Sequence, residues 1–430
     1  MLLLPTDVYI SAGVAVVALT VLALFALPAR RIIALFSVRS LPGWRVPRGL
    51  TTATSILSFA LLAALVAIGI AGPNGPLENV LPLSFWTLGW IAIVSLSGIF
   101  GNLWDWMNPW TGLYRLIAPE WRQRQLPSFL GLWPALVLLL GFTAFLLADV
   151  APNDPPRLAV IVAIYWCATM AGLLVFGPGW VTHIELGHAI MTTYAKLATW
   201  TSDTPAGIGA PGWQIVTTPE VRGAGVFALT LLAAGSFDGI NETFWWLAQI
   251  GVNPLEFPGR SAVIGSTLAG LLGAVAALII VFAFAVWAGL AMAAGNVGFA
   301  LAFGRLALSV LPIALVYHMS HYMTSFLVNI QYTILAFDDP LDIGASLLGL
   351  RDFRVTTGFF NHLDWVRVIW LSQAGLVVLG HVWSVLLCHR IALDLFSDHR
   401  RAAIVTLPLS LFMIGYTFLG LWLLAAPKGA

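Results

Sequence analysis

The sequence predicts an all-α, polytopic transmembrane helix bundle, and three features of its composition lead to that prediction. Of the 430 residues, 60% are hydrophobic and only 9% are charged, and the mean hydropathy is +0.92. Soluble globular chains are about 45–50% apolar and about 25% charged. A chain with so few charged residues cannot keep its surface in water, so we place it in a lipid bilayer.

The apolar runs, and the turn residues that separate them, predict about ten membrane spans within a single integral membrane domain. A span needs roughly 20 apolar residues, and loops such as AGPNGPLEN at 71–79 carry the Pro, Gly and Asn that end helices. The expected spans lie near residues 8–28, 51–71, 85–101, 129–150, 158–177, 223–240, 262–290, 304–335, 366–391 and 404–426.

The distribution of Lys and Arg predicts the orientation, because cytoplasmic loops retain positive charge. If the N-terminus lies outside, the cytoplasmic segments hold 14 of these residues and the outer segments hold 6. The first loop alone contributes five, namely Arg30, Arg31, Arg39, Arg45 and Arg48. We therefore expect both termini on the outer side of the membrane.

Two connections are too long to be simple turns. Segment 178–222 contains the stretch WVTHIELGHAIMTTYAKLATW, which predicts an amphipathic helix on the cytoplasmic interface, and segment 337–365 forms an outer loop. The formal net charge of +1 gives no field that would attract nucleic acid. The expected partners are the lipid bilayer and other subunits of a membrane complex, and the sequence leaves the oligomeric state open.

Histidine is the ionisable residue that the sequence places at mid-depth in the membrane. His318 and His321 are three residues apart, so they share one side of their helix, and His381 lies at a comparable depth in the next span. Ionisable residues at such depth usually face the bundle interior and mark functional sites. Three neutral imidazoles resemble a catalytic zinc site, two opposed imidazoles suit haem b, and buried histidines also simply bond neighbouring helices.

Asp238 lies in the sequence GSFDGINETFWW at the outer end of its span. Beside Gly239, its carboxylate fits a helix end or turn. It also fits a fourth metal ligand or a catalytic base if the span turns inward early. We take Asp238 as the candidate catalytic residue, and His318, His321 and His381 as the candidate ligands of a divalent zinc, copper or iron ion.

Other polar motifs favour structural roles. His183 and His188 are five residues apart and cannot share a metal on a regular helix, although Glu185 and His188 share a face. The tryptophans of GNLWDWMNPW are typical of an aromatic belt at the inner interface. His362 and Asp364 fit a wetted outer loop.

The chain resembles a family of bacterial integral membrane proteins labelled fenitrothion hydrolase, and the resemblance covers most of its length. In that family the positions matching Asp238, His318, His321, His381 and His389 recur. The resemblance implies hydrolysis of an apolar organophosphorus triester. It is carried by LLPTDVYISAG at 3–13, NPW at 108–110, FDG at 237–239, YHMSHY at 317–322, GHVWSVLLCHRIAL at 380–393 and YTFLGLWLLAAP at 416–427.

Three functions agree with the sequence. The first is a membrane-embedded, metal-dependent hydrolase, in which a metal would lower the pKa of a water molecule. The second is a membrane subunit of electron transfer that binds haem b or copper through the same histidines. The third is a transporter, or a non-catalytic subunit, in which the polar stripes line a path or join helices.

Overall fold

The structure is a computed structural model that describes residues 5–41, 47–117, 124–201, 206–253, 255–256, 259–293, 297–396 and 398–427. Three residues of the charge count, Arg45, Arg122 and Lys428, lie outside the described residues, as does 202–205 of the cytoplasmic segment.

The described chain is almost entirely helical. Its helices are α1 (Thr6–Ala26), α2 (Ala29–Leu35), α3 (Arg48–Ala71), α4 (Val80–Leu83), the π-helix η1 (Ser84–Ile93), α5 (Val94–Phe100), α6 (Trp104–Met107), α7 (Thr111–Ile117), η2 (Ser128–Leu130), α8 (Trp133–Ala148), α9 (Pro155–Phe176), α10 (Gly179–His183), α11 (Leu186–Ala195), α12 (Trp213–Thr217), α13 (Ala224–Asn241), α14 (Phe244–Gln249), η3 (Arg260–Ala262), α15 (Ile264–Ala293), α16 (Phe299–Ala307), η4 (Leu308–Val310), α17 (Leu311–Asp338), η5 (Gly358–Asn361), α18 (Leu363–Leu395) and α19 (His399–Ala425).

The prediction of a multi-pass helix bundle is confirmed. Within the described residues, nine helical segments are long and apolar enough to cross a membrane. They are α1, α3, Val80–Phe100, α9, α13, α15, Phe299–Asp338, α18 and α19. The remaining predicted run, 129–150, corresponds to α8, an apolar helix of 16 residues.

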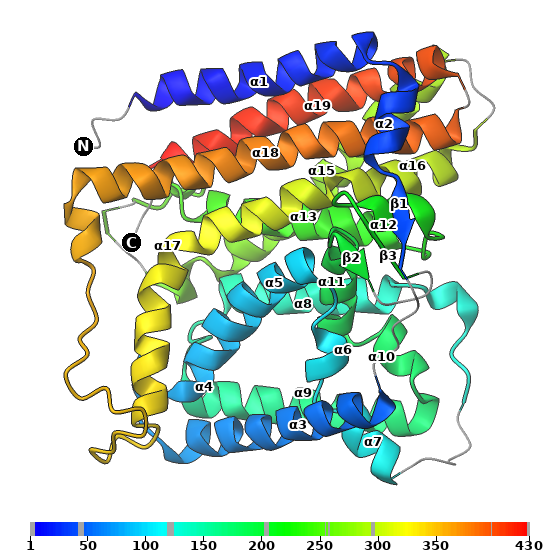
Figure 1. Ribbon diagram of the computed structural model, residues 1–430. Coiled ribbons are helices and arrows are strands. Elements are labelled where there is room, and N and C mark those ends of the chain that lie inside the picture. Colours follow the sequence, from blue (N-terminus) through cyan, green and yellow to red (C-terminus); the bar gives the residue numbers. More distant parts are fainter. Residues whose placement is uncertain are drawn as a thin grey trace.

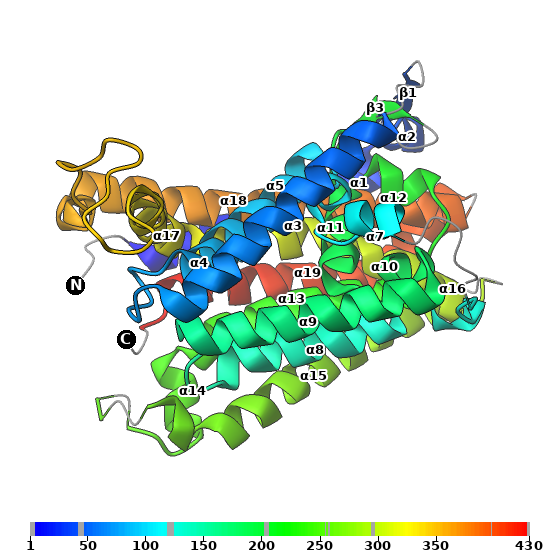
Figure 2. The same ribbon diagram turned by 90° about the horizontal axis from the view of Figure 1, so that it is seen from below.

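The long helices form two groups that run in nearly the same direction (Figure 1). One group contains α1, α13, α15, α18 and α19, and the other contains α3 and α9. In the view turned by 90°, α8 lies between α9 and α15 (Figure 2). The segment from α4 to α5 slants between the groups, and the second half of α17 runs across them. Both ends of the described chain lie at the same end of the bundle.

A small antiparallel sheet departs from the all-α prediction. Strands β1 (Val38–Ser40), β2 (Trp200–Thr201) and β3 (Gly207–Gly209) pair in the order β1-β3-β2. The sheet ties the first loop to segment 178–222, since β2 begins 160 residues after the end of β1.

Segment 178–222 differs from the expected interfacial helix. The chain breaks at Glu185 into α10 and α11, and most side chains of α11, including Ile190 and Tyr194, are buried in the main hydrophobic core. The apolar residues of this stretch therefore pack against other helices and do not form the lipid-facing side of a surface helix.

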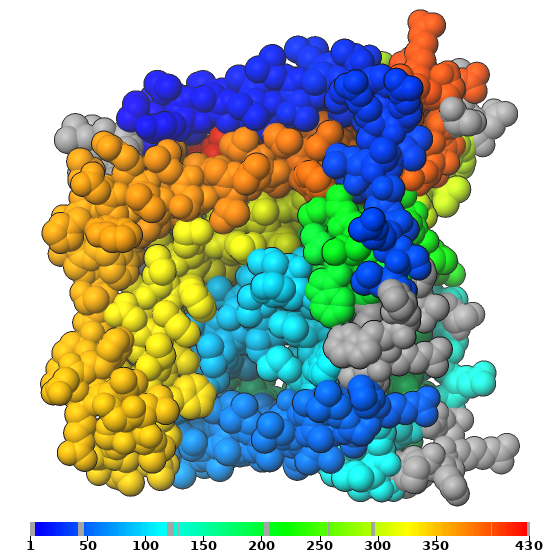
Figure 3. Space-filling model, viewed as in Figure 1, coloured from blue at the N-terminus to red at the C-terminus, as the bar shows by residue number. Residues whose placement is uncertain are grey.

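One face of the molecule is hollowed between the two helix groups. The space-filling view shows this hollow bordered by α3, α5 and the second half of α17 (Figure 3). Exposed apolar side chains are abundant on α3, with Leu57 and Leu61 more than half exposed. Such surfaces are typical of helices that face lipid, because lipid imposes no penalty on exposed apolar groups.

Candidate metal site between α13 and α17

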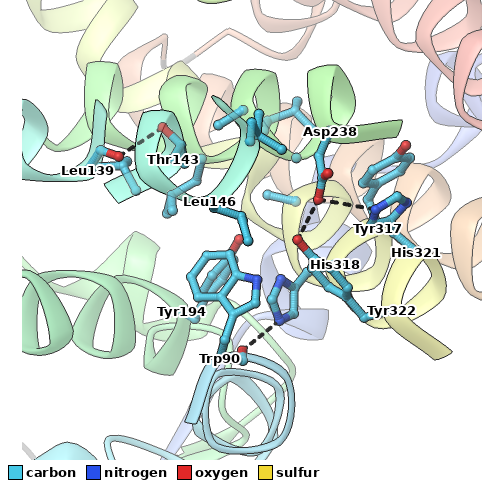
Figure 4. A pocket seen from close by; sticks show the side chains of 16 residues that line it. Trp90, Leu139, Thr143, Leu146, Tyr194, Asp238, Tyr317, His318, His321 and Tyr322 are labelled. Atoms are coloured by element: carbon cyan, nitrogen blue, oxygen red, sulfur yellow. Dashed lines mark hydrogen bonds and ion pairs between the residues drawn. The ribbon is translucent and has the colours of Figure 1, made fainter. Parts of the chain in front are cut away.

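Helices α13 and α17 bring a carboxylate, an imidazole and a phenol together (Figure 4). Asp238 on α13 is 8% exposed, and its Oδ2 lies 3.1 Å from Nε2 of His321 on α17. The Tyr322 hydroxyl donates a short hydrogen bond to the same carboxylate oxygen. Because two residues on one helix hold one carboxylate on another, the position of Asp238 is determined from two directions.

Glu242 adds a second carboxylate to this pair. It follows Asp238 by one helical turn, and Asp238, Glu242 and His321 each offer one ligand atom, all within 4.8 Å of one another. Among the described residues, this is the one group of three such side chains that could hold a metal ion. The sequence interpretation missed Glu242, which lies just beyond the predicted span 223–240; its i+4 spacing from Asp238 was the signal that could have found it.

One imidazole nitrogen and two carboxylate oxygens form a donor set that suits zinc, iron or manganese. The set runs from the interior to the surface, because Asp238 is buried, His321 is half-buried and Glu242 is exposed. An ion held there would have protein ligands on its inner side and an approach from outside past Glu242. A catalytic zinc site likewise uses three protein ligands and leaves one position open.

His318 lines the inner side of the same pocket. Its Nε2 lies 3.0 Å from the carbonyl oxygen of Trp90 in η1, so this nitrogen carries the hydrogen and donates. The ring also meets Trp90 and Tyr322 edge to face. The pocket, which Asp238 and His321 line as well, offers about 30 Å³ to water-sized molecules. This volume suits one or two water molecules.

Haem b does not fit this pocket. Ligand pockets for molecules of drug size and above occupy about 300–1,000 Å³, far more than the space beside His318 and His321. In addition, the Nε2 atom of His318, which would be the axial ligand of a haem, already donates a hydrogen bond to the Trp90 carbonyl oxygen.

His381 lies apart from the other two predicted ligands. Its ring packs toward Tyr416 of α19, and its Nδ1 donates to the carbonyl oxygen of Val377 at 2.8 Å. Its Nε2 is buried and has no hydrogen-bond partner among the described residues. The structure therefore brings His318 and His321 into one pocket but leaves His381 between α18 and α19. The side chains that converge as potential ligands are Asp238, Glu242 and His321, and not the three expected histidines.

Gly239 permits the close packing of α13 on α17. A Cβ atom at this position would lie 2.2 Å from the Tyr317 hydroxyl oxygen, and the Tyr317 ring stacks on His321 with ring centres 5.8 Å apart. The residue after Asp238 must therefore be small, which gives a physical reason for the sequence FDG.

The stretch His183 to His188 has a structural role. Glu185 is the N-cap of α11, where its carboxylate accepts hydrogen bonds from the backbone N–H groups of Gly187 and His188. It also accepts from the Trp104 indole at 2.8 Å and from the Tyr165 hydroxyl at 3.0 Å. Burial raises the pKa of Glu185 above its ordinary value, and the four hydrogen bonds oppose that rise.

The tryptophans of GNLWDWMNPW and the pair His362 and Asp364 were also expected to have structural roles. Trp104 and Trp110 were expected in an interfacial belt, but their indoles bond inside the protein, to Glu185 and to the Trp166 carbonyl respectively. His362 and Asp364 are exposed at the start of α18, as expected for a wetted outer segment.

No protein-family model, curated protein or solved structure matches the chain.

Proposed function

We propose that the chain is a multi-pass membrane protein that binds a divalent cation through Asp238, Glu242 and His321 and hydrolyses an apolar ester. The observation that carries the proposal is the convergence of three ligand atoms within 4.8 Å, beside a pocket of water size. A divalent cation in this position would supply a water molecule of lowered pKa and polarise the ester.

The protein side chains would position this chemistry. The Tyr322 hydroxyl holds Asp238, and stacking on Tyr317 orients the His321 ring. Such supporting contacts orient metal ligands and tune their basicity. His318 donates through Nε2, so the Nδ1 of its neutral ring is available as a proton acceptor for a water molecule in the pocket.

The location of the site favours a substrate that partitions into the bilayer. We propose ten spans with both termini outside, in a bacterial inner membrane, which places Glu242 on the outer side. The pocket itself is too small for an organic molecule, so the ester would dock at the exposed side of Glu242. The family resemblance suggests an organophosphorus triester with an aryl leaving group.

The test begins with the metal content of the purified protein, measured by inductively coupled plasma mass spectrometry. We expect Glu242→Gln and His321→Gln each to remove one equivalent of metal and the hydrolysis of a nitrophenyl phosphotriester. His381→Gln changes a buried histidine outside the site and serves as the control. Unchanged metal content and hydrolysis in Glu242→Gln and His321→Gln would refute the proposal.

A second candidate function is transport of the cation itself. It is favoured by the gradient from exposed Glu242 to buried Asp238, and by a pocket that admits water but no organic substrate. Uptake of Zn²⁺ or Mn²⁺ into proteoliposomes distinguishes the two functions. A transporter would accumulate the ion and lose uptake in Asp238→Asn, whereas a hydrolase would bind it without accumulation.

A further inference from the structure

A second pair of neighbouring histidines, one buried and one half-buried, lies where α18 ends and α19 begins. His389 is in the last turns of α18 and His399 is the first residue of α19, and their ring centres are 5.4 Å apart at a near-perpendicular angle. Helices α18 and α19 lie side by side over their length (Figure 1). This pair therefore lies at the end of α18 away from the long loop that precedes the helix, and the predicted topology makes that end cytoplasmic.

The hydrogen bonds of His389 leave one nitrogen ready to bind a metal. Its Nδ1 lies 3.5 Å from the Thr406 hydroxyl oxygen, which itself donates to the Ala402 carbonyl, so the hydroxyl can only accept from Nδ1–H. Nε2 then carries a lone pair, is fully buried and has no partner. Histidines that bind metals characteristically donate their other ring N–H in this way.

His399 contributes a second unpartnered nitrogen. Its Nδ1 is buried without a hydrogen-bond partner, although the ring as a whole is half-buried. A buried polar atom without a partner destabilises the folded protein. Two such atoms on neighbouring imidazoles are therefore unusual for an ordinary ring contact.

The ring separation agrees with a shared metal ion. Metal–nitrogen bonds of about 2.0–2.1 Å place an ion about 3.2 Å from the centre of each ring. Two rings that share an ion at a tetrahedral angle would then have centres about 5.2 Å apart. The observed 5.4 Å matches this value.

The surroundings of His389 are mostly apolar. The cavity beside its ring offers about 10 Å³ to water-sized molecules and is lined by Thr406, Ser410 and four apolar side chains, but by no carboxylate and not by His399. Nearby Arg390 is paired with Asp394. Neutral imidazoles without carboxylates are ligands that copper and zinc accept, whereas magnesium and calcium require oxygen.

We propose that His389 and His399 form a transition-metal site of two imidazoles, for copper(I) or zinc, that is separate from the outer site. The Thr406 hydroxyl orients the His389 ring, and the remaining positions on the ion would be filled by water or by the Ser410 hydroxyl. This proposal does not depend on the function of the outer site.

To test this proposal, the Glu242→Gln/His321→Gln variant, in which the outer site is disabled, is purified. It is titrated with zinc and, separately, with copper(I) under reducing conditions. We expect one equivalent to bind in this background with at least one of the two metals. Adding His389→Gln or His399→Gln should abolish it, and adding His381→Gln should not. His381 is the matched control because its Nε2 is equally buried and unpartnered but has no second imidazole beside it.

X-ray absorption of the metal-loaded protein in this background keeps the proposal testable if the histidine variants fail to fold. We expect scattering from two imidazoles with nitrogens at about 2.0 Å. Failure of both metals to bind, or a bound metal with oxygen ligands only, would overturn the proposal. Because the outer site is already disabled in this background, the metal bound there reports only on His389 and His399, and the two sites are tested separately.

Discussion

The Nε2 atom of His321 lies 3.1 Å from Oδ2 of Asp238, and the two residues are 83 positions apart in the sequence. The Tyr322 hydroxyl donates to the same oxygen from the next position on α17. This arrangement couples the C-terminal end of α13 to the middle of α17. It brings one carboxylate and one imidazole together between two helices that are long and apolar enough to cross a membrane.

We expect Tyr322→Phe to weaken metal binding by about 10–100-fold, because supporting hydrogen bonds to ligands typically contribute that much. The phenyl ring keeps the packing against His318 and His321 but no longer holds Asp238. Isothermal titration of the purified protein with Zn²⁺ measures the change. Tyr332→Phe, on the same helix, is the control, and equal affinities in the two variants would contradict the role of Tyr322.

Gly239→Ala should destabilise the protein by about 1–3 kcal/mol, as overpacked sites do. The new methyl group would collide with the Tyr317 hydroxyl at 2.2 Å and displace the ring that stacks on His321. We therefore expect metal affinity to fall together with the thermal unfolding temperature in detergent.

Gly235→Ala is the matched control, because it lies one turn earlier on the same helix. A Cβ atom there would meet Tyr317 at 3.6 Å, an ordinary contact. The protein should then tolerate the substitution or gain stability, since alanine favours helix by about 1 kcal/mol over glycine. If Gly235→Ala and Gly239→Ala lose the same stability, the packing argument is wrong.

His188 should make stability depend on pH on the acid side. Burial, with a smaller contribution from His183, lowers the pKa of His188 from 6.5 to about 4. Between these values the unfolded chain binds more protons than the folded one, so stability rises as pH increases from about 4 to 6.5. The rise is at most about 3.4 kcal/mol, at 1.36 kcal/mol for each of about 2.5 pKa units.

His188→Gln should flatten this part of the stability profile. Thermal unfolding at a series of pH values measures it, and the comparison needs the same detergent throughout. Glu185 acts in the opposite direction, because its pKa is raised in the folded protein. Its contribution to the stability of the protein is therefore lost as pH rises above the ordinary pKa of a glutamate. A profile that keeps the full rise without His188 would assign the effect to another group.

Glu185→Ala should destabilise the segment that contains α11. The change removes an N-cap worth about 1 kcal/mol, and it leaves the Trp104 indole and the Tyr165 hydroxyl without their acceptor at about 1–3 kcal/mol each. Glu185→Gln retains a carbonyl oxygen and should lose much less. Proteolysis within 178–222 followed over time reports the local effect, and equal cleavage rates in the two variants would show that the hydrogen bonds contribute little.

Much of the fold could be predicted from composition and apolar runs. Each of the ten predicted spans falls on a helix of the structure, because bilayer-crossing helices need long apolar stretches that are visible in the sequence. The exception was the amphipathic stretch at 180–200, where the capping hydrogen bonds of Glu185 break the helix and the tertiary structure buries its second half.

The sequence by itself determined that this protein is a multi-pass helical membrane protein with histidines inside its apolar helices, and it pointed to Asp238, His318 and His321. Only the tertiary structure decided which of these side chains meet. Helical periodicity places residues on faces of one helix, but it does not define the rotation of one helix against another. For that reason His381 turned toward Tyr416 on α19, while Glu242 and Tyr322 joined Asp238 and His321.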